Sequence, residues 1–66
     1  MREVYADVLS QLEGVRESLI DISIATLQEA IESGAATRPT SDKKLAQATR
    51  AIEKAIDAVK AAASAD

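Results

Sequence analysis

The first half of the chain carries two stripes of apolar residues at helical spacing. Residues of an α-helix advance by about 100° each, so positions three and four apart share a face. The first stripe alternates these two spacings and consists of Tyr5, Val8, Leu12, Val15, Leu19 and Ile22. The second stripe consists of Leu9, Ile20, Ile24, Leu27 and Ile31. The pattern predicts one long helix over residues 3–33, with an apolar arc that covers more than half of its circumference.

A break in this pattern separates the long helix from a second, shorter one. Gly34 suits the left-handed position that commonly ends a helix, and Pro39 steers the residue before it away from helical geometry. We therefore expect a loop over 34–40 and a second helix over 41–63. Its apolar seam again alternates spacings of three and four and consists of Leu45, Ala48, Ile52, Ala55, Val59 and Ala62.

The first stripe and the seam of the second helix fit each other when the helices run antiparallel. In that arrangement Val59 faces Val15 and Ala62 faces Leu12, so that large side chains meet either each other or alanine. Alanine at alternate positions lets two helix backbones approach closely. The predicted fold class is therefore all-α, a coiled-coil-like antiparallel two-helix hairpin in a single domain over 1–66. In this register the first helix overhangs the second at its N-terminal end.

The predicted hairpin leaves the second stripe uncovered, because one neighbouring helix covers only one stripe. We expect Ile56 to lie uncovered beside it. Burial of a large apolar side chain contributes about 1.5–3 kcal/mol, and a chain of 66 residues without cysteine has few other sources of stability. We therefore expect two hairpins to form a four-helix bundle. The residues predicted to bind the partner are Leu9, Arg16, Ile20, Ile24, Leu27 and Ile31.

Arg16 interrupts the apolar arc between the two stripes. One interpretation pairs it with Glu13 of a second chain, in an ion pair that fixes the register of a dimer. The other interpretation lets its aliphatic stem cover apolar surface while the guanidinium reaches water. The sequence favours neither.

Charge is distributed unevenly along a chain whose net charge is −3. Residues 1–33 carry seven acids and two bases, whereas residues 34–66 carry four acids and six bases. The halves are complementary, which favours packing of one against the other over binding of a polyanion. Nucleic acid is therefore not an expected partner, and a regulator that binds it through Arg38, Lys43 and Lys44 is only the third hypothesis.

The residue types that support most catalysis are missing from this chain. It contains no histidine and no cysteine, which removes the usual nucleophile–base pairs and zinc ligands. The acidic ridge of Glu13, Glu17 and Asp21 follows a spacing of four residues. A solvated ridge explains this cluster better than a metal site, because no other ligand type supports it. We expect no enzyme activity, no cofactor and no metal.

The apolar runs are too short for a membrane span, since none approaches 18 residues. The N-terminus also lacks the basic and then apolar segment of a secretory signal, so a cytoplasmic location is expected. The leading hypothesis is a non-catalytic module that self-associates through the second stripe. The alternative is an adaptor or small chaperone whose apolar face covers a different helical protein.

Overall fold

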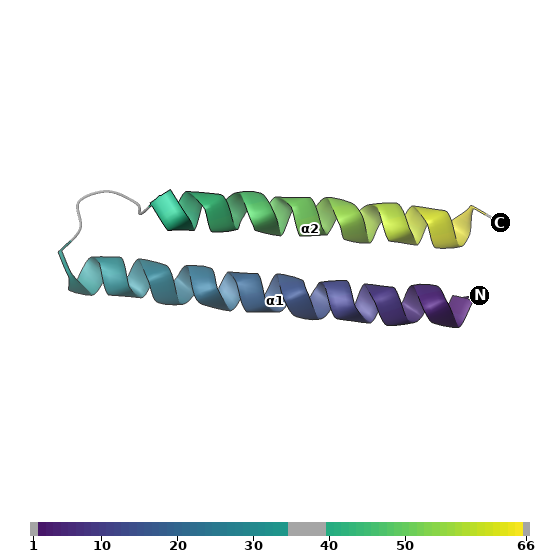
Figure 1. Ribbon diagram of the computed structural model, residues 1–66, viewed down its shortest axis with the longest axis horizontal. Coiled ribbons are helices and arrows are strands. Elements are labelled where there is room, and N and C mark those ends of the chain that lie inside the picture. The colour runs from purple at the N-terminus through teal and green to yellow at the C-terminus, as the bar shows by residue number, and fades with distance from the viewer. Residues whose placement is uncertain (1, 35–39, 66) are drawn as a thin grey trace.

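A computed structural model describes residues 2–34 and 40–65, which form two long helices. Helix α1 spans Arg2–Glu32 and helix α2 spans Thr40–Ser64, and the described residues contain no strand. The helices lie side by side and antiparallel, so that α1 begins at the end of the hairpin where α2 finishes (Figure 1). The Cα atoms extend over 52 × 15 × 10 Å. The prediction of an all-α chain with two helices is confirmed, and each helix boundary lies within one residue of its predicted place.

The C-terminus of α1 has the predicted glycine geometry. Gly34 has a φ angle of 75°, which is the left-handed conformation. Its N–H donates to the carbonyl of Ile31 at 3.0 Å, and the Ser33 N–H donates to the carbonyl of Glu29 at 3.0 Å. These bonds use two carbonyl groups that the end of a helix would otherwise leave without a partner. The remainder of the predicted loop, residues 35–39, lies outside the described residues.

The contact between the helices follows a seam in which spacings of three and four residues alternate. On α1 the half-buried seam residues are Tyr5, Leu9, Leu12, Arg16, Leu19, Ser23, Thr26 and Ala30. On α2 the seam residues are Leu45, Thr49, Ile52, Ile56, Val59 and Ala63. Among the described residues only Ile56 is a fully buried apolar residue, with 2% of its surface exposed. The hairpin therefore has a thin core, centred on Ile56.

The predicted seam on α1 was wrong in half of its positions. Val8, Val15 and Ile22 were expected to face α2, but they are 38%, 46% and 51% exposed. Ile56 was expected to be uncovered, yet it is the most buried apolar residue of the described chain. The reason is that α2 packs against the middle of the broad apolar arc of α1, whereas the prediction placed α2 over one of its edges. Both edges of the arc consequently remain exposed.

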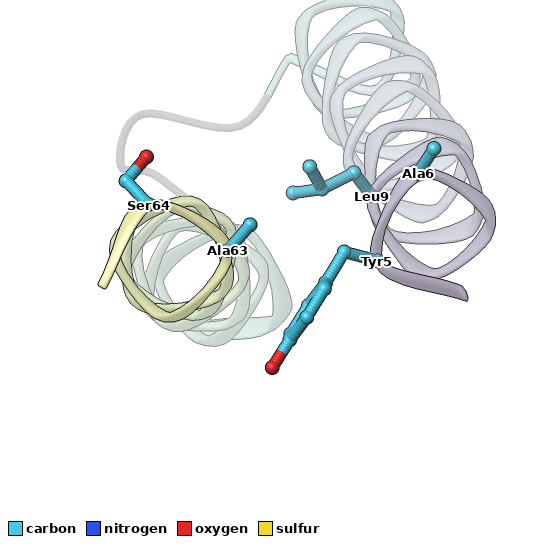
Figure 2. A pocket seen from close by; sticks show the side chains of 5 residues that line it. All are labelled: Tyr5, Ala6, Leu9, Ala63 and Ser64. Atoms are coloured by element: carbon cyan, nitrogen blue, oxygen red, sulfur yellow. The ribbon is translucent and has the colours of Figure 1, made fainter. Parts of the chain in front are cut away.

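The predicted register of the two helices was also wrong. Tyr5, Ala6 and Leu9 of α1 line a surface hollow together with Ala63 and Ser64 of α2 (Figure 2). With equal rise along both helices, this contact places Ile56 at the level of Leu12, about six residues or ~9 Å from the predicted pairing. The register brings Ile56 and Val59 to the N-terminal half of the α1 seam, which contains Leu9 and Leu12 and is called its leucine-rich half.

The predicted N-terminal overhang of the first helix is therefore absent. Ala63 and Ser64 reach the first turns of α1, where the overhang was expected. At the opposite end of the hairpin, α1 extends past the start of α2 (Figure 1). Ile31 lies in this unmatched turn and is exposed.

Candidate functional site

The hairpin has two broad sides, and Figure 2 shows which residues share one of them. Viewed along the helices, Ala6 of α1 and Ser64 of α2 point to the same side, away from the gap between the helices. Leu9 and Ala63 instead point into that gap. Because successive residues advance by about 100°, the other positions of each helix can be assigned to the side of Ala6 and Ser64 or to the opposite side.

The side opposite Ala6 and Ser64 carries one apolar row from each helix. We call this surface the valine–alanine face. Its rows are Val8, Val15 and Ile22 on α1 and Ala48, Ala55 and Ala62 on α2. The three residues on α1 are exposed, and the alanines are exposed or half-buried. Both rows repeat every seven residues, from Val8 to Ile22 on α1 and from Ala48 to Ala62 on α2, so the face follows most of the helix contact.

The side of Ala6 and Ser64 carries a second exposed apolar row, which we call the isoleucine face. It consists of Ile20, Ile24 and Ile31 on α1. On this side α2 contributes charged residues along its whole length, namely Lys43, Arg50, Glu53, Asp57 and Lys60. The isoleucine face is therefore an apolar strip in the C-terminal half of α1, preceded on the same side by Glu13 and Glu17, beside a charged strip of α2.

The six residues predicted to bind a partner do not all share one surface. Three of them form the isoleucine face, and Leu27 lies half-buried at its edge. Leu9 and Arg16 lie in the seam, where α2 covers part of their surface. The structure therefore gathers four of the six on one side of the hairpin and places the other two between the helices.

Arg16 is the one charged residue in the described seam of α1, at the level of Ile52. Its side chain is half-buried, and no buried side-chain nitrogen or oxygen of the described residues lacks a hydrogen-bond partner. A half-buried position of this kind lets the aliphatic stem of an arginine cover apolar surface, and it leaves both interpretations of Arg16 open.

The acidic side chains of residues 2–34 and 40–65 form no cluster that could hold a metal ion. Glu13, Glu17 and Asp21 are exposed, and no three acidic, histidine or cysteine side chains in these ranges come together in a way that could hold a metal ion. Lys43 and Lys44 are exposed at the start of α2, and Arg38 lies outside the described residues. The apolar faces are therefore the candidate site.

The molecule exposes more surface than a compact monomer of its mass. Its solvent-accessible surface is 4995 Å² for 7.0 kDa. The scaling of surface with mass gives about 4,000 Å² for a compact monomer of this size, so the excess is roughly 1,000 Å². A standard protein–protein interface covers about 800 Å² on each partner. The excess is thus large enough to supply one such interface.

No described helix combines the length and the apolar character that a membrane crossing requires. Comparison with protein-family models, with curated proteins and with solved structures gives no match to this chain. Function is therefore inferred from the two apolar faces.

The valine–alanine face was missed as a surface, although its two rows are visible in the sequence. The heptad spacing of Val8, Val15 and Ile22, and that of the alanines, was assigned to contact within one chain. Ile56 is the signal in the sequence that distinguishes a seam through the alanine row from a seam beside it. A seam that includes Ile56 buries more apolar area than one that includes Ala55 in its place, and the alanine row then turns outward.

Proposed function

We propose that this chain is a non-catalytic interaction module that assembles with copies of itself through apolar residues exposed on α1. The observation that carries the proposal is that α1 exposes large apolar residues on both sides while its seam includes polar ones. Its seam holds Arg16, Ser23 and Thr26, whereas the β-branched residues of both faces are exposed to solvent. Exposed apolar surface on this scale marks interaction sites in soluble proteins.

Burial of these side chains would add to the apolar surface that the hairpin already buries in its thin core. The large apolar residues exposed in the described chain all lie on α1 and are Val4, Val8, Val15, Ile20, Ile22, Ile24 and Ile31. Full burial of one such side chain contributes about 1.5–3 kcal/mol. Because these side chains are 38–75% exposed in the hairpin, covering all seven would contribute roughly 5–11 kcal/mol, which is comparable to the total stability of a small domain. Assembly is thus a source of stability as well as a function.

The test is the solution mass of the purified chain by sedimentation equilibrium across the micromolar range, with helicity followed by circular dichroism. We expect a helical dimer whose thermal midpoint rises with chain concentration, because association stabilises the folded state by mass action. A well-folded monomer at every concentration would contradict the proposal.

The isoleucine face supports a second candidate function, an adaptor or small chaperone that covers a different helical protein. Its three isoleucines stand beside charged residues of α2, so the surface is not self-complementary in the way that a symmetric homodimer requires. For this candidate the purified chain alone would be poorly folded or would aggregate, and it would fold when its partner is added.

A further inference from the structure

We infer that a second copy of the chain docks on the valine–alanine face, with a two-fold axis parallel to the helices. In this dimer α1 of each chain packs on α2 of the other. The inference rests on the proposed self-association and specifies both the face and the topology. Four observations support it: the scarcity of charge on the face, the sizes of the facing side chains, the charges of the helices and the length of the face.

The valine–alanine face is free of charged residues over most of its length. On α1 the positions that share this side from Val8 onwards are Val8, Gln11, Val15, Ser18, Ile22 and Ala25, followed by Glu29 near the end of the helix. On α2 the corresponding positions are Lys44 in the first turns and then Ala48, Ala51, Ala55, Ala58 and Ala62. The opposite side would bury five charged residues of α2 from each copy, and unpaired burial of charge is costly. An interface between two copies therefore has a smaller desolvation cost on the valine–alanine face.

The sizes of the side chains select the direction of the two-fold axis. An axis across the helices would place α1 over α1 and α2 over α2, so that large rows meet large rows and alanines meet alanines. An axis parallel to the helices places the large row of each copy over the alanine row of the other. Tyr5 and Ala63 fix the register of the helices. In this register Val15 and Ala55 differ in height along the helix axis by about two residues, or ~3 Å. Large and small positions then interlock evenly.

The charges of the helices favour the same direction. Arg2–Glu32 carries seven acidic and two basic residues, a net charge of −5. Thr40–Ser64 carries three acidic and five basic residues, a net charge of +2. With the axis parallel to the helices, every pair of neighbouring helices joins an acidic helix to a basic one. With the axis across them, two strongly acidic helices would lie in contact and repel each other.

The face is long enough for an extended contact between two copies. The hairpin is 52 Å long, and the face uses both helices. The whole molecule exposes roughly 1,000 Å² more than a compact monomer of its mass, and the valine–alanine face supplies part of this excess.

The first test compares two matched charge substitutions on α1. Val15 is 46% exposed on the valine–alanine face and Ile24 is 50% exposed on the isoleucine face. We expect Val15→Glu to raise the dimer dissociation constant roughly a hundredfold or more, because symmetry buries the new carboxylate twice. We expect Ile24→Glu to change it less than about threefold, as for an exposed surface position. Sedimentation equilibrium gives both values.

The second test does not depend on whether a charged variant folds. The chain has no cysteine, so Val15→Cys and Ala55→Cys can be made separately and mixed under oxidising conditions. Disulfides form only where Cα atoms lie within about 7 Å. We expect the mixed disulfide between the two variants to dominate, because α1 of one copy lies on α2 of the other.

The outcomes separate this inference from the proposed function. A monomeric wild-type chain overturns both. A wild-type dimer that survives Val15→Glu and is lost in Ile24→Glu overturns the choice of face and keeps the self-association. A dimer lost in Val15→Glu whose cysteine variants form no mixed disulfide overturns the topology alone.

Discussion

Tyr5 and Ala63 come from opposite ends of the sequence and line the same hollow where α1 begins and α2 finishes (Figure 2). This contact fixes the register of the two helices. It places the leucine-rich half of the α1 seam against Ile56 and Val59, and it leaves the far end of α1 unmatched (Figure 1). This register therefore decides which apolar residues of α1 remain exposed.

The register predicts that a larger side chain at position 63 stabilises the hairpin. Ala63→Leu adds apolar atoms beside Tyr5 and Leu9, and we expect about 1 kcal/mol of added stability because part of the new side chain becomes buried. Urea denaturation at one chain concentration measures the change. Ala61→Leu is the control, since position 61 is exposed and should stay within about 0.5 kcal/mol of the wild type. Equal effects at both positions would contradict the register.

Ile56 should carry more of the stability than any other single side chain of α2. It is 2% exposed, and truncation of a buried isoleucine to alanine costs about 2–5 kcal/mol. We expect Ile56→Ala to lose an amount in this range by chemical denaturation. Lys54→Ala on the exposed side of the same helix should change stability by no more than about 0.5 kcal/mol. A loss below about 0.5 kcal/mol for Ile56→Ala would show that the seam lies elsewhere.

The two glycines should respond in opposite directions to replacement by alanine. A Cβ added at Gly14 meets nothing within 4 Å, and the residue lies inside α1. Gly14→Ala should therefore raise stability by about 0.5–1 kcal/mol, since glycine loses more conformational entropy on folding. Gly34 has a φ angle of 75°, so Gly34→Ala should lower stability by about 1–2 kcal/mol. Thermal unfolding of both variants at one concentration measures the pair, and a gain at position 34 would contradict the assigned helix end.

Replacement of Arg16 distinguishes its two interpretations. If its stem packs in the seam, Arg16→Leu should raise the free energy of unfolding by about 1 kcal/mol, because leucine places more apolar area in this half-buried position. Glu13→Gln should then have no effect on the dimer mass. Loss of association in both variants would support the inter-chain ion pair instead. Denaturation curves and sedimentation equilibrium together decide between them.

The sequence by itself determined the elements of this fold. Helical periodicity, Gly34 and the break before position 40 each depend on local geometry, because backbone conformation and the position of apolar residues on a helix are set by neighbours three or four residues away. The excess of apolar surface on the first helix was visible for the same reason. Its isoleucines at 20, 24 and 31 are exposed, as the second stripe implied.

Only the tertiary structure decided how the two helices meet. Several rotations and registers of two amphipathic helices satisfy the same heptad spacing, and they differ in the total area buried, which no local pattern reports. The structure turns Ile56 inward and Ala55 towards the edge of the seam, and this one rotation exposes the row of Val8, Val15 and Ile22. The valine–alanine face exists because a single neighbour covers the centre of a broad apolar arc and leaves both edges open.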